Sequence, residues 1–427
     1  MRSSMQAIFR EHFATFAHSH LLHPRELRAA RCIRDCYSAA LGGHVLSCPQ
    51  AHYSVVQYHA CRHRSCPRCC ARARQQWVQA QLQQLLACPH FHLVFTLPHV
   101  FIALWEFNRA WMNQLLFDCA RQSLLALCAD PRHLGAMPGL LMSLHTWGRT
   151  LSRHPHVHCL ASAGGIDGAG QWRASHGDFL VPVRPLQLLF RGKLLAQLKH
   201  ALDAQRLHLP PQQDAQHWRG TIAQQYRKHW NIEISPPYAN GRGVALYLAR
   251  YVRGGPLPND RVLDSANGSV SFDYTDHRDH LRKTLRLSAS EFIVRVLWHA
   301  PPQAQHTVRR AGLYASAHRA HHQACRDQLT DTPMPAPAQP IACHPLTPGA
   351  PGAPGAPGAS PRCPVCNADL VHTASLLPMH RFSEFSIAAP APRAGCAGPT
   401  GRSNGQTTAD HDCTLRRRSL RRRFPFN

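Results

Sequence analysis

Acidic residues are scarce in this sequence. The 427 residues include 23 Asp and Glu against 48 Lys and Arg, which gives a formal net charge of +25 and a pI near 10.1. A charge of this size and sign favours a polyanionic partner, and nucleic acid is the leading candidate. Part of the excess comes from the Arg-rich run at residues 416–423, which is equally compatible with a solvated tail.

Long apolar runs are also missing. No stretch reaches the roughly 18 uninterrupted apolar residues of a membrane-spanning helix, and the best candidate, Phe91–Trp105, is broken by His92, Pro98 and His99. Residues 1–13 contain Arg and Glu and no apolar segment of the kind that a secretory signal carries. We therefore expect a soluble, cytoplasmic protein with no membrane association.

The 17 cysteines are then expected to be reduced thiols, and short spacings between them favour metal sites over disulfides. Cys66 and Cys69 form a C-x2-C knuckle, and Cys48 and Cys61 precede it. Four thiolates in about two dozen residues would suit a closed tetrahedral zinc site. The neighbouring residues are Arg, His, Ser and Pro, so the alternative of simply buried thiols fits less well.

A second C-x2-C pair, Cys363 and Cys366, lies near the end of the chain. Two ligands do not complete a structural zinc site, which usually has four. A second zinc site would therefore need partners, for which the sequence offers Cys343 with His344, or Cys396 with Cys413.

Apolar periodicity predicts helices at the start of the chain, then strands mixed with helices. The ranges expected to be helical are 5–40, 72–86, 105–127, 186–207, 244–252 and 290–299. Strand character is present at 91–97, 139–147 and 154–162, and a hairpin is expected at 270–274 and 281–287. This predicts an α+β fold with an antiparallel sheet and flanking helices, preceded by a small zinc-binding helical domain.

The composition changes after residue 330. The segment 331–361 is rich in Pro, Gly and Ala, with the repeat PGAPGAPGAPGAS, and is expected to be a disordered linker. We expect a zinc-binding domain at 1–88, a catalytic domain at 89–330, and a basic tail at 362–427 with the possible second zinc knuckle.

The sharpest chemical feature is a pair of histidines one residue apart, His156 and His158. On a strand, positions i and i+2 point to one face, so both imidazoles could bind one metal ion. His145 could join them if residues 148–153 form the turn of a hairpin, whereas His154 is expected at the rim. Three neutral ligands leave open positions on a divalent ion, as in catalytic sites. In a chain with 32 histidines, surface or core roles remain an alternative.

Two tyrosines, Tyr247 and Tyr251, are four residues apart in the expected helix at 244–252. Residues at this spacing share one helix face, so both phenols could reach one site. Aromatic residues at i and i+4 also commonly pack in a core. Together with the histidines and the positive charge, however, the pair favours covalent catalysis by a tyrosine nucleophile.

These residues resemble the IS-ninety-one-like family of HUH rolling-circle transposases, from about Arg31 to Tyr314. The likeness is carried by several blocks: CRHRSCPRC, FHLVFTLPH, LHTWGRTLSRHPHVHCL, YLARYV and DHRDHLRKTLRLSASEFIVRVLWHAPP. The family usually has Cys-x2-Cys at its first knuckle, whereas here Cys48 is followed by Pro, Gln and Ala. Either Cys61 or His52 would then supply the missing ligand.

The resemblance implies a DNA transposase with an N-terminal zinc-binding domain and an HUH nuclease domain. His156 and His158 match the HUH ligands, and Tyr247 and Tyr251 match the tyrosine pair. The implied reaction is attack of a tyrosine on single-stranded DNA at the element's ends, giving a 5′-phosphotyrosine that is later transferred to target DNA. Phosphate chemistry favours Mg²⁺ or Mn²⁺ as the catalytic ion, beside structural Zn²⁺. Alternatives are a plasmid replication initiator or relaxase, and a zinc-dependent DNA-binding protein without catalysis.

Overall fold

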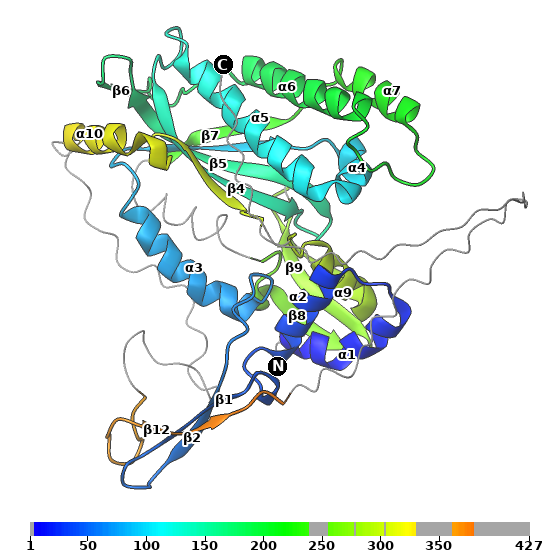
Figure 1. Ribbon diagram of the computed structural model, residues 1–427, viewed down its shortest axis with the longest axis vertical. Coiled ribbons are helices and arrows are strands. Elements are labelled where there is room, and N and C mark those ends of the chain that lie inside the picture. Colours follow the sequence, from blue (N-terminus) through cyan, green and yellow to red (C-terminus); the bar gives the residue numbers. More distant parts are fainter. Residues whose placement is uncertain (1–3, 239–254, 277–278, 303–304, 330–360, 380–427) are drawn as a thin grey trace, which may run out of the picture. The chain divides into compact units, whose positions relative to one another are not determined.

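The computed structural model describes residues 4–238, 255–276, 279–302, 305–329 and 361–379 (Figure 1). The expected helix at 244–252, nearly all of the expected linker and most of the expected tail lie outside these ranges. Within them, no helix has the length and apolar content needed to cross a membrane.

The central sheet has six strands and is antiparallel throughout, which confirms the expected α+β fold. Its main strands lie side by side in the order β11 (Val308–Gly312), β4 (Met137–Trp147), β5 (Arg153–Ile166), β3 (His90–Thr96) and β7 (Ile232–Tyr238). The short strand β6 (Trp172–Ala174) pairs with the end of β5.

Alternation along the strands gives the two faces of this sheet different chemistry. On β5, Val157 and Cys159 point into the main hydrophobic core, which also contains residues of α5 (Arg109–Ala129), α6 (Val183–Asp203) and α7 (Ala215–Gln225). Figure 1 shows these helices over one face of the sheet. Because side chains alternate along a strand, the neighbouring residues His156 and His158 point to the opposite face.

The expected helix at 105–127 is divided into α4 (Ile102–Phe107) and α5. The Asn108 side chain between them donates to the carbonyls of Leu104 and His208, at 2.9 and 2.7 Å. An Asn that bonds nearby backbone in this way competes with the helical hydrogen-bond pattern. Asn108 therefore marks the boundary between the two helices.

A smaller core lies on the histidine face, next to α3 (Pro67–Leu82) and α10 (Arg319–Leu329). It contains a buried polar chain: His90 Nε2 lies 2.6 Å from the Tyr314 hydroxyl, which accepts from the Leu86 amide at 3.2 Å. His90 Nδ1 lies 2.9 Å from the Cys88 carbonyl. The imidazole is thus satisfied in its neutral form, with Nδ1 donating and Nε2 accepting.

The N-terminal helices α1 (Met5–Ser19) and α2 (Pro24–Asp35) do not pack with the cysteine region alone. Their apolar residues, including Phe9 and Phe13, share a core with Phe272 and Phe292. Those partners lie on the expected hairpin, β9 (Ser269–Thr275) and β10 (Arg282–Ser288), which is extended by β8 (Val262–Ala266), and on α9 (Ala289–Trp298). The boundary drawn at residue 88 therefore does not separate two hydrophobic cores, because contacts distant in sequence join segments on either side of it.

The start of the expected basic tail is ordered. Residues 371–376 form β12, which pairs with β1 (Gly43–Ser47), and β1 pairs in turn with β2 (Ser54–Tyr58). Figure 1 shows β12 in orange beside the two blue strands. A six-residue strand of this kind gains its stability from a partner more than 300 residues away, which local patterning does not reveal.

Buried histidines make the stability of this fold depend on pH. Burial lowers the pKa of His90 to about 4 and that of His299 to about 3, from 6.5. At pH values between 6.5, the unfolded pKa, and these lower folded pKa values, the unfolded chain binds more protons than the folded one. The unfolding free energy should therefore decrease as pH falls from about 6.5 towards 4. For His90 the full effect is up to about 3 kcal/mol. Urea denaturation at several pH values should show this loss, and His90→Gln should flatten the slope; equal slopes for both proteins would contradict the assignment.

Candidate active site

The hairpin β4–β5 brings three histidines together. The turn at residues 148–152 closes with a hydrogen bond from the Gly148 amide to the Ser152 carbonyl, at 2.8 Å. This turn sets the register in which His145 lies opposite His156. His158 follows on the same face, and the ligand nitrogens of all three lie within 4.8 Å of one another.

The spacing of the ring nitrogens fits a shared ion. His156 Nε2 and His158 Nε2 are 3.0 Å apart. Two ligands at about 2.1 Å from one ion and at right angles to each other would be separated by about 3.0 Å, as in octahedral coordination. The ring centroid of His145 lies 4.6 Å from that of His158 and 5.4 Å from that of His156.

Neighbouring groups orient two of these rings. His156 Nδ1 lies 2.6 Å from the His154 carbonyl, so Nδ1 carries the proton and Nε2 is free to act as a ligand. His158 Nδ1 lies 2.9 Å from His92 Nε2. In the matching tautomer, His158 donates from Nδ1 to His92 and directs its own Nε2 towards His156. Such outer hydrogen bonds commonly fix metal-binding histidines.

His92 was not among the sequence-predicted site residues. It lies on β3, directly beside β5, and on the same face as His158 because Val94, two residues on, is the partner of His158. Strand parity alone would place His92 on this face, but only the strand order places β3 next to β5. His154, expected at the rim, contributes its carbonyl to the site as described above.

Burial keeps these rings neutral. Desolvation is the main cause that lowers the pKa of His156 and of His158 well below 6.5, and the neighbouring histidines lower both further. Burial also lowers the pKa of His92 to about 4. At neutral pH the group thus offers neutral nitrogen donors, the form in which histidine binds metals.

A cavity of about 60 Å³ adjoins His145, and its lining also includes Trp147 and Arg109. Gly255 and Pro256 also line it. These two residues directly follow the undescribed segment 239–254, whose other end continues from β7 in the same sheet. The segment is therefore attached at one end beside His145.

The predicted nucleophiles Tyr247 and Tyr251 are in that segment and lie outside the described residues. Tyr251 precedes Gly255, the first described residue after this segment, by four positions. Its role stays a prediction.

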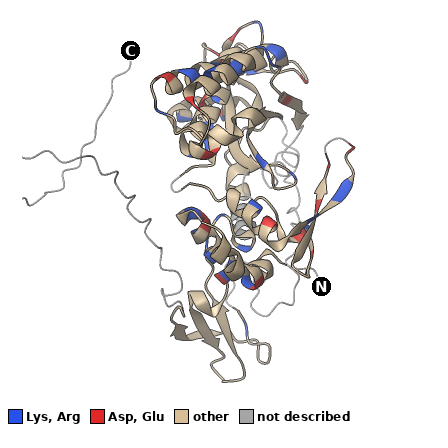
Figure 2. Cartoon of the chain, turned by 90° about the vertical axis from the view of Figure 1, so that its right-hand side faces the viewer, with Lys and Arg blue, Asp and Glu red and all other residues tan. Residues whose placement is uncertain are grey.

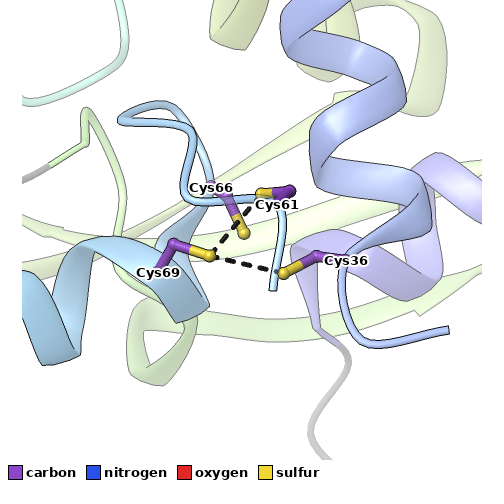
Figure 3. A group of neighbouring side chains, drawn as sticks. All are labelled: Cys36, Cys61, Cys66 and Cys69. Carbon is purple, nitrogen blue, oxygen red and sulfur yellow. Dashed lines mark hydrogen bonds between the residues drawn. The ribbon is translucent and has the colours of Figure 1, made fainter. Parts of the chain in front are cut away.

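Four cysteines form a compact cluster: Cys36, Cys61, Cys66 and Cys69 (Figure 3). Cys69 Sγ lies 3.5 Å from the sulfurs of both Cys36 and Cys61. Thiolates around one zinc ion at about 2.3 Å would be about 3.8 Å apart, so the cluster fits a tetrahedral zinc site. Backbone amides of Arg62 and His63 point at Cys69 Sγ and Cys61 Sγ, at 3.2 and 3.5 Å.

This ligand set corrects the prediction at one position. Cys36, just after α2, completes the cluster, whereas the sequence spacing had indicated Cys48. Cys48 lies instead 3.4 Å from Cys366, sulfur to sulfur, in a separate group that includes His52 and Cys363. The reason is packing: the Phe-rich core places the end of α2 beside the knuckle, while β1 carries Cys48 away from it.

Cys32, one helical turn before Cys36, lies at the margin of the cluster. Cys32 and Cys36 raise the pKa of Cys61 far above its usual range, whereas neighbouring Cys36 lowers the pKa of Cys69. Thiolates this close together repel one another unless a cation lies between them.

Comparison with known proteins gives two family matches. The model of a family described as putative transposase matches residues 139–322, which include the three histidines. The model of a family described as transposase zinc-binding domain, of the IS91 type, matches residues 8–97, which include the four-cysteine cluster.

Two curated relatives are similar over much of the chain. The putative transposase y4qJ of Sinorhizobium fredii is 36% identical over 340 residues, which are 78% of this chain and 85% of the relative. The transposase for insertion sequence element IS801 of Pseudomonas savastanoi pv. phaseolicola is 34% identical over 280 residues, 63% of this chain and 64% of the relative. No solved structure matches.

The ligand set of the cluster can be tested by comparing Cys36 with Cys32, which lies four residues before it in the sequence. Cys36→Ser in the full-length chain should lower bound zinc by about one equivalent, because a structural site requires all four ligands. Cys32→Ser is the matched control and should retain the metal. The zinc content of each variant is measured by elemental mass spectrometry after dialysis. Loss of zinc in Cys32→Ser with zinc retained in Cys36→Ser would instead assign Cys32 as the ligand.

Proposed function

The chain belongs to the IS-ninety-one-like family of rolling-circle insertion-sequence transposases, and on that premise we propose that it nicks and rejoins single-stranded DNA through a tyrosine nucleophile beside a histidine-bound divalent ion. The observation that carries the proposal is the convergence of His145, His156 and His158 on one sheet face. The substrates would be the ends of the element and the target DNA.

The histidine group is open, unlike a closed structural site with four protein ligands, and would therefore suit catalytic Mg²⁺ or Mn²⁺. Three neutral nitrogens fill about half of an octahedral shell and leave positions for phosphate oxygens. An ion bound there would polarise the scissile phosphate and make phosphorus a better electrophile. His92 and the His154 carbonyl would hold the ligand rings in the required tautomers.

The chemical step belongs to a tyrosine. Its Oη would attack phosphorus and form an O–P bond while the bond from phosphorus to the 3′ oxygen breaks. The phenol loses its proton and the departing 3′ oxygen takes one up, so the products are the phosphotyrosine ester and a free 3′-OH. A 5′-phosphotyrosine keeps the energy of the broken ester, so a 3′-OH of donor or target DNA can reverse the step and rejoin the strand.

The charge distribution is consistent with binding over a broad surface. Figure 2 shows Lys and Arg spread over many helices and strands, with fewer Asp and Glu between them. Contacts with many phosphates give a strong dependence on salt and little dependence on any one residue. Loss of a single catalytic side chain should therefore affect cleavage far more than binding.

The histidine assignment predicts a separation of binding from cleavage. His156→Ala or His158→Ala should reduce cleavage of single-stranded oligonucleotides bearing the element's ends by at least about 100-fold, because an ion that polarises phosphate contributes several kcal/mol. Affinity for single-stranded DNA should stay nearly unchanged. His154→Ala is the matched control, since its side chain is outside the proposed ligand set, and should cut normally. Wild-type cleavage by either ligand variant in Mg²⁺ would exclude the site.

The tyrosine pair predicts a division of labour. Two nucleophiles let one enzyme hold a covalent 5′ end while it makes a second cut, so Tyr247→Phe or Tyr251→Phe should block complete transposition. The double variant should form no covalent adduct with single-stranded DNA, because Phe lacks the attacking oxygen and preserves ring packing. Adduct formation on denaturing gels gives the result. An adduct in the double variant would place the nucleophile elsewhere, and a defect in one single variant alone would mean that one tyrosine suffices.

A further inference from the structure

A second group of metal-binding side chains joins two distant parts of the chain. Cys48 follows β1, Cys363 and Cys366 precede β12, and His52 lies in the turn between β1 and β2. Ligand atoms of the four lie within 4.8 Å of one another. Cys48 Sγ is 3.4 Å from Cys366 Sγ and 3.9 Å from His52 Nδ1.

We propose that Cys48, His52, Cys363 and Cys366 bind a second structural zinc ion, as a Cys3His site. This site is distinct from the four-cysteine cluster, with which it shares no ligand. Two of its ligands lie outside residues 8–97, the range matched by the transposase zinc-binding domain. Cys343, His344, Cys396 and Cys413, the partners that the sequence offered, lie outside the described residues, and four ligands are present without them.

The two halves of the site are tight turns of the kind that present paired ligands. After Cys48, the Ala51 amide donates to the Cys48 carbonyl at 2.9 Å, and Ala51 has a φ of +59°. After Cys363, the Asn367 amide donates to the Cys363 carbonyl at 2.9 Å, and Asn367 has a φ of +58°. The first turn closes over four residues and the second over five, and both bring their ligands into one group.

An amide-to-sulfur contact repeats a feature of the first cluster. The Val365 amide points at Cys363 Sγ at 3.4 Å, as the His63 amide points at Cys61 Sγ at 3.5 Å. Such contacts stabilise the negative charge of a thiolate, the form in which cysteine binds zinc. The same local geometry therefore accompanies both proposed zinc sites.

The sheet β12-β1-β2 has too little core to hold these turns together. Its buried apolar residues are Cys48, Cys363 and Leu370, with Leu46, Val55 and Cys366 partly buried beside them. Every residue of β12 except the last is exposed. Very small cores of this kind usually depend on a metal or a disulfide for stability. Zinc bound by three thiolates and an imidazole would supply that stability.

His52 can replace the cysteine that is missing from the Cys-x2-Cys pair beginning at Cys48. Ala51 occupies the position at which a C-x2-C pair would place its second cysteine, and Ala has no ligand atom. The next residue, His52, has its ring nitrogen near Cys48 Sγ. His52 is exposed, and its ligand atom already lies within 4.8 Å of the three sulfurs.

Metal analysis of the full-length protein tests the proposal independently of DNA cleavage. Cys363→Ala and Cys366→Ala should each lower bound zinc by about one equivalent, because the remaining ligands no longer close the site. Cys325→Ala, at a buried thiol outside both groups, is the matched control and should keep the wild-type content. Adding Cys36→Ser to Cys366→Ala should remove about one more equivalent.

Cobalt substitution identifies the ligands. His52→Cys should retain the metal and shift the visible cobalt bands to longer wavelength, since a fourth thiolate replaces nitrogen. His52→Ala should weaken binding of one ion and leave the other unchanged. Wild-type zinc in both Cys363→Ala and Cys366→Ala would overturn the site. A Cys48–Cys366 disulfide found by mass spectrometry in unreduced protein without this zinc would also overturn it, and unchanged spectra in both His52 variants would remove His52 from the ligand set.

Discussion

The register of the hairpin β4–β5 is the constraint on which the rest of the site depends. Side chains alternate along a strand, so a shift of one residue in this pairing would send His145 into the apolar core and Leu144 to the opposite face. The core fixes the register because Leu144 and Val157 are buried against the covering helices. Hydrophobic packing on one face thus determines which polar groups meet on the other.

Much of this site could be predicted from sequence because its information is local. The spacing of His156 and His158 and the turn at 148–152 suffice to bring in His145. His92 could not be assigned in the same way, because its position beside His158 depends on β3 being the neighbour of β5. Strand order is a property of the whole sheet, and no short pattern specifies it.

The zinc ligands illustrate the same limit. Cys61, Cys66 and Cys69 are close in sequence and fall in one cluster, but the fourth ligand is set by how α2 packs. Cys36 and Cys48 both precede the knuckle, and the shared core of α1, α2 and α9 places the more distant of the two beside it. The pairing of β12 with β1 was equally invisible, because its partner strand lies at the other end of the chain. The α+β fold itself was predicted correctly, since the strands and helices have clear periodicities.

The distance along the chain between the two halves of the Cys3His group has a consequence for biosynthesis. Cys48 and Cys366 are separated by 318 residues. At roughly 5–20 residues per second, a ribosome needs roughly 15–60 s to add that length of chain. During this interval Cys48 and His52 have left the ribosome without Cys363 and Cys366. The pairing of β12 with β1 and the proposed metal link can therefore form only after residue 376 has been translated, whereas the β1–β2 hairpin has both of its strands from the start. A copy that terminates before Cys363 would lack this link between the two parts of the chain.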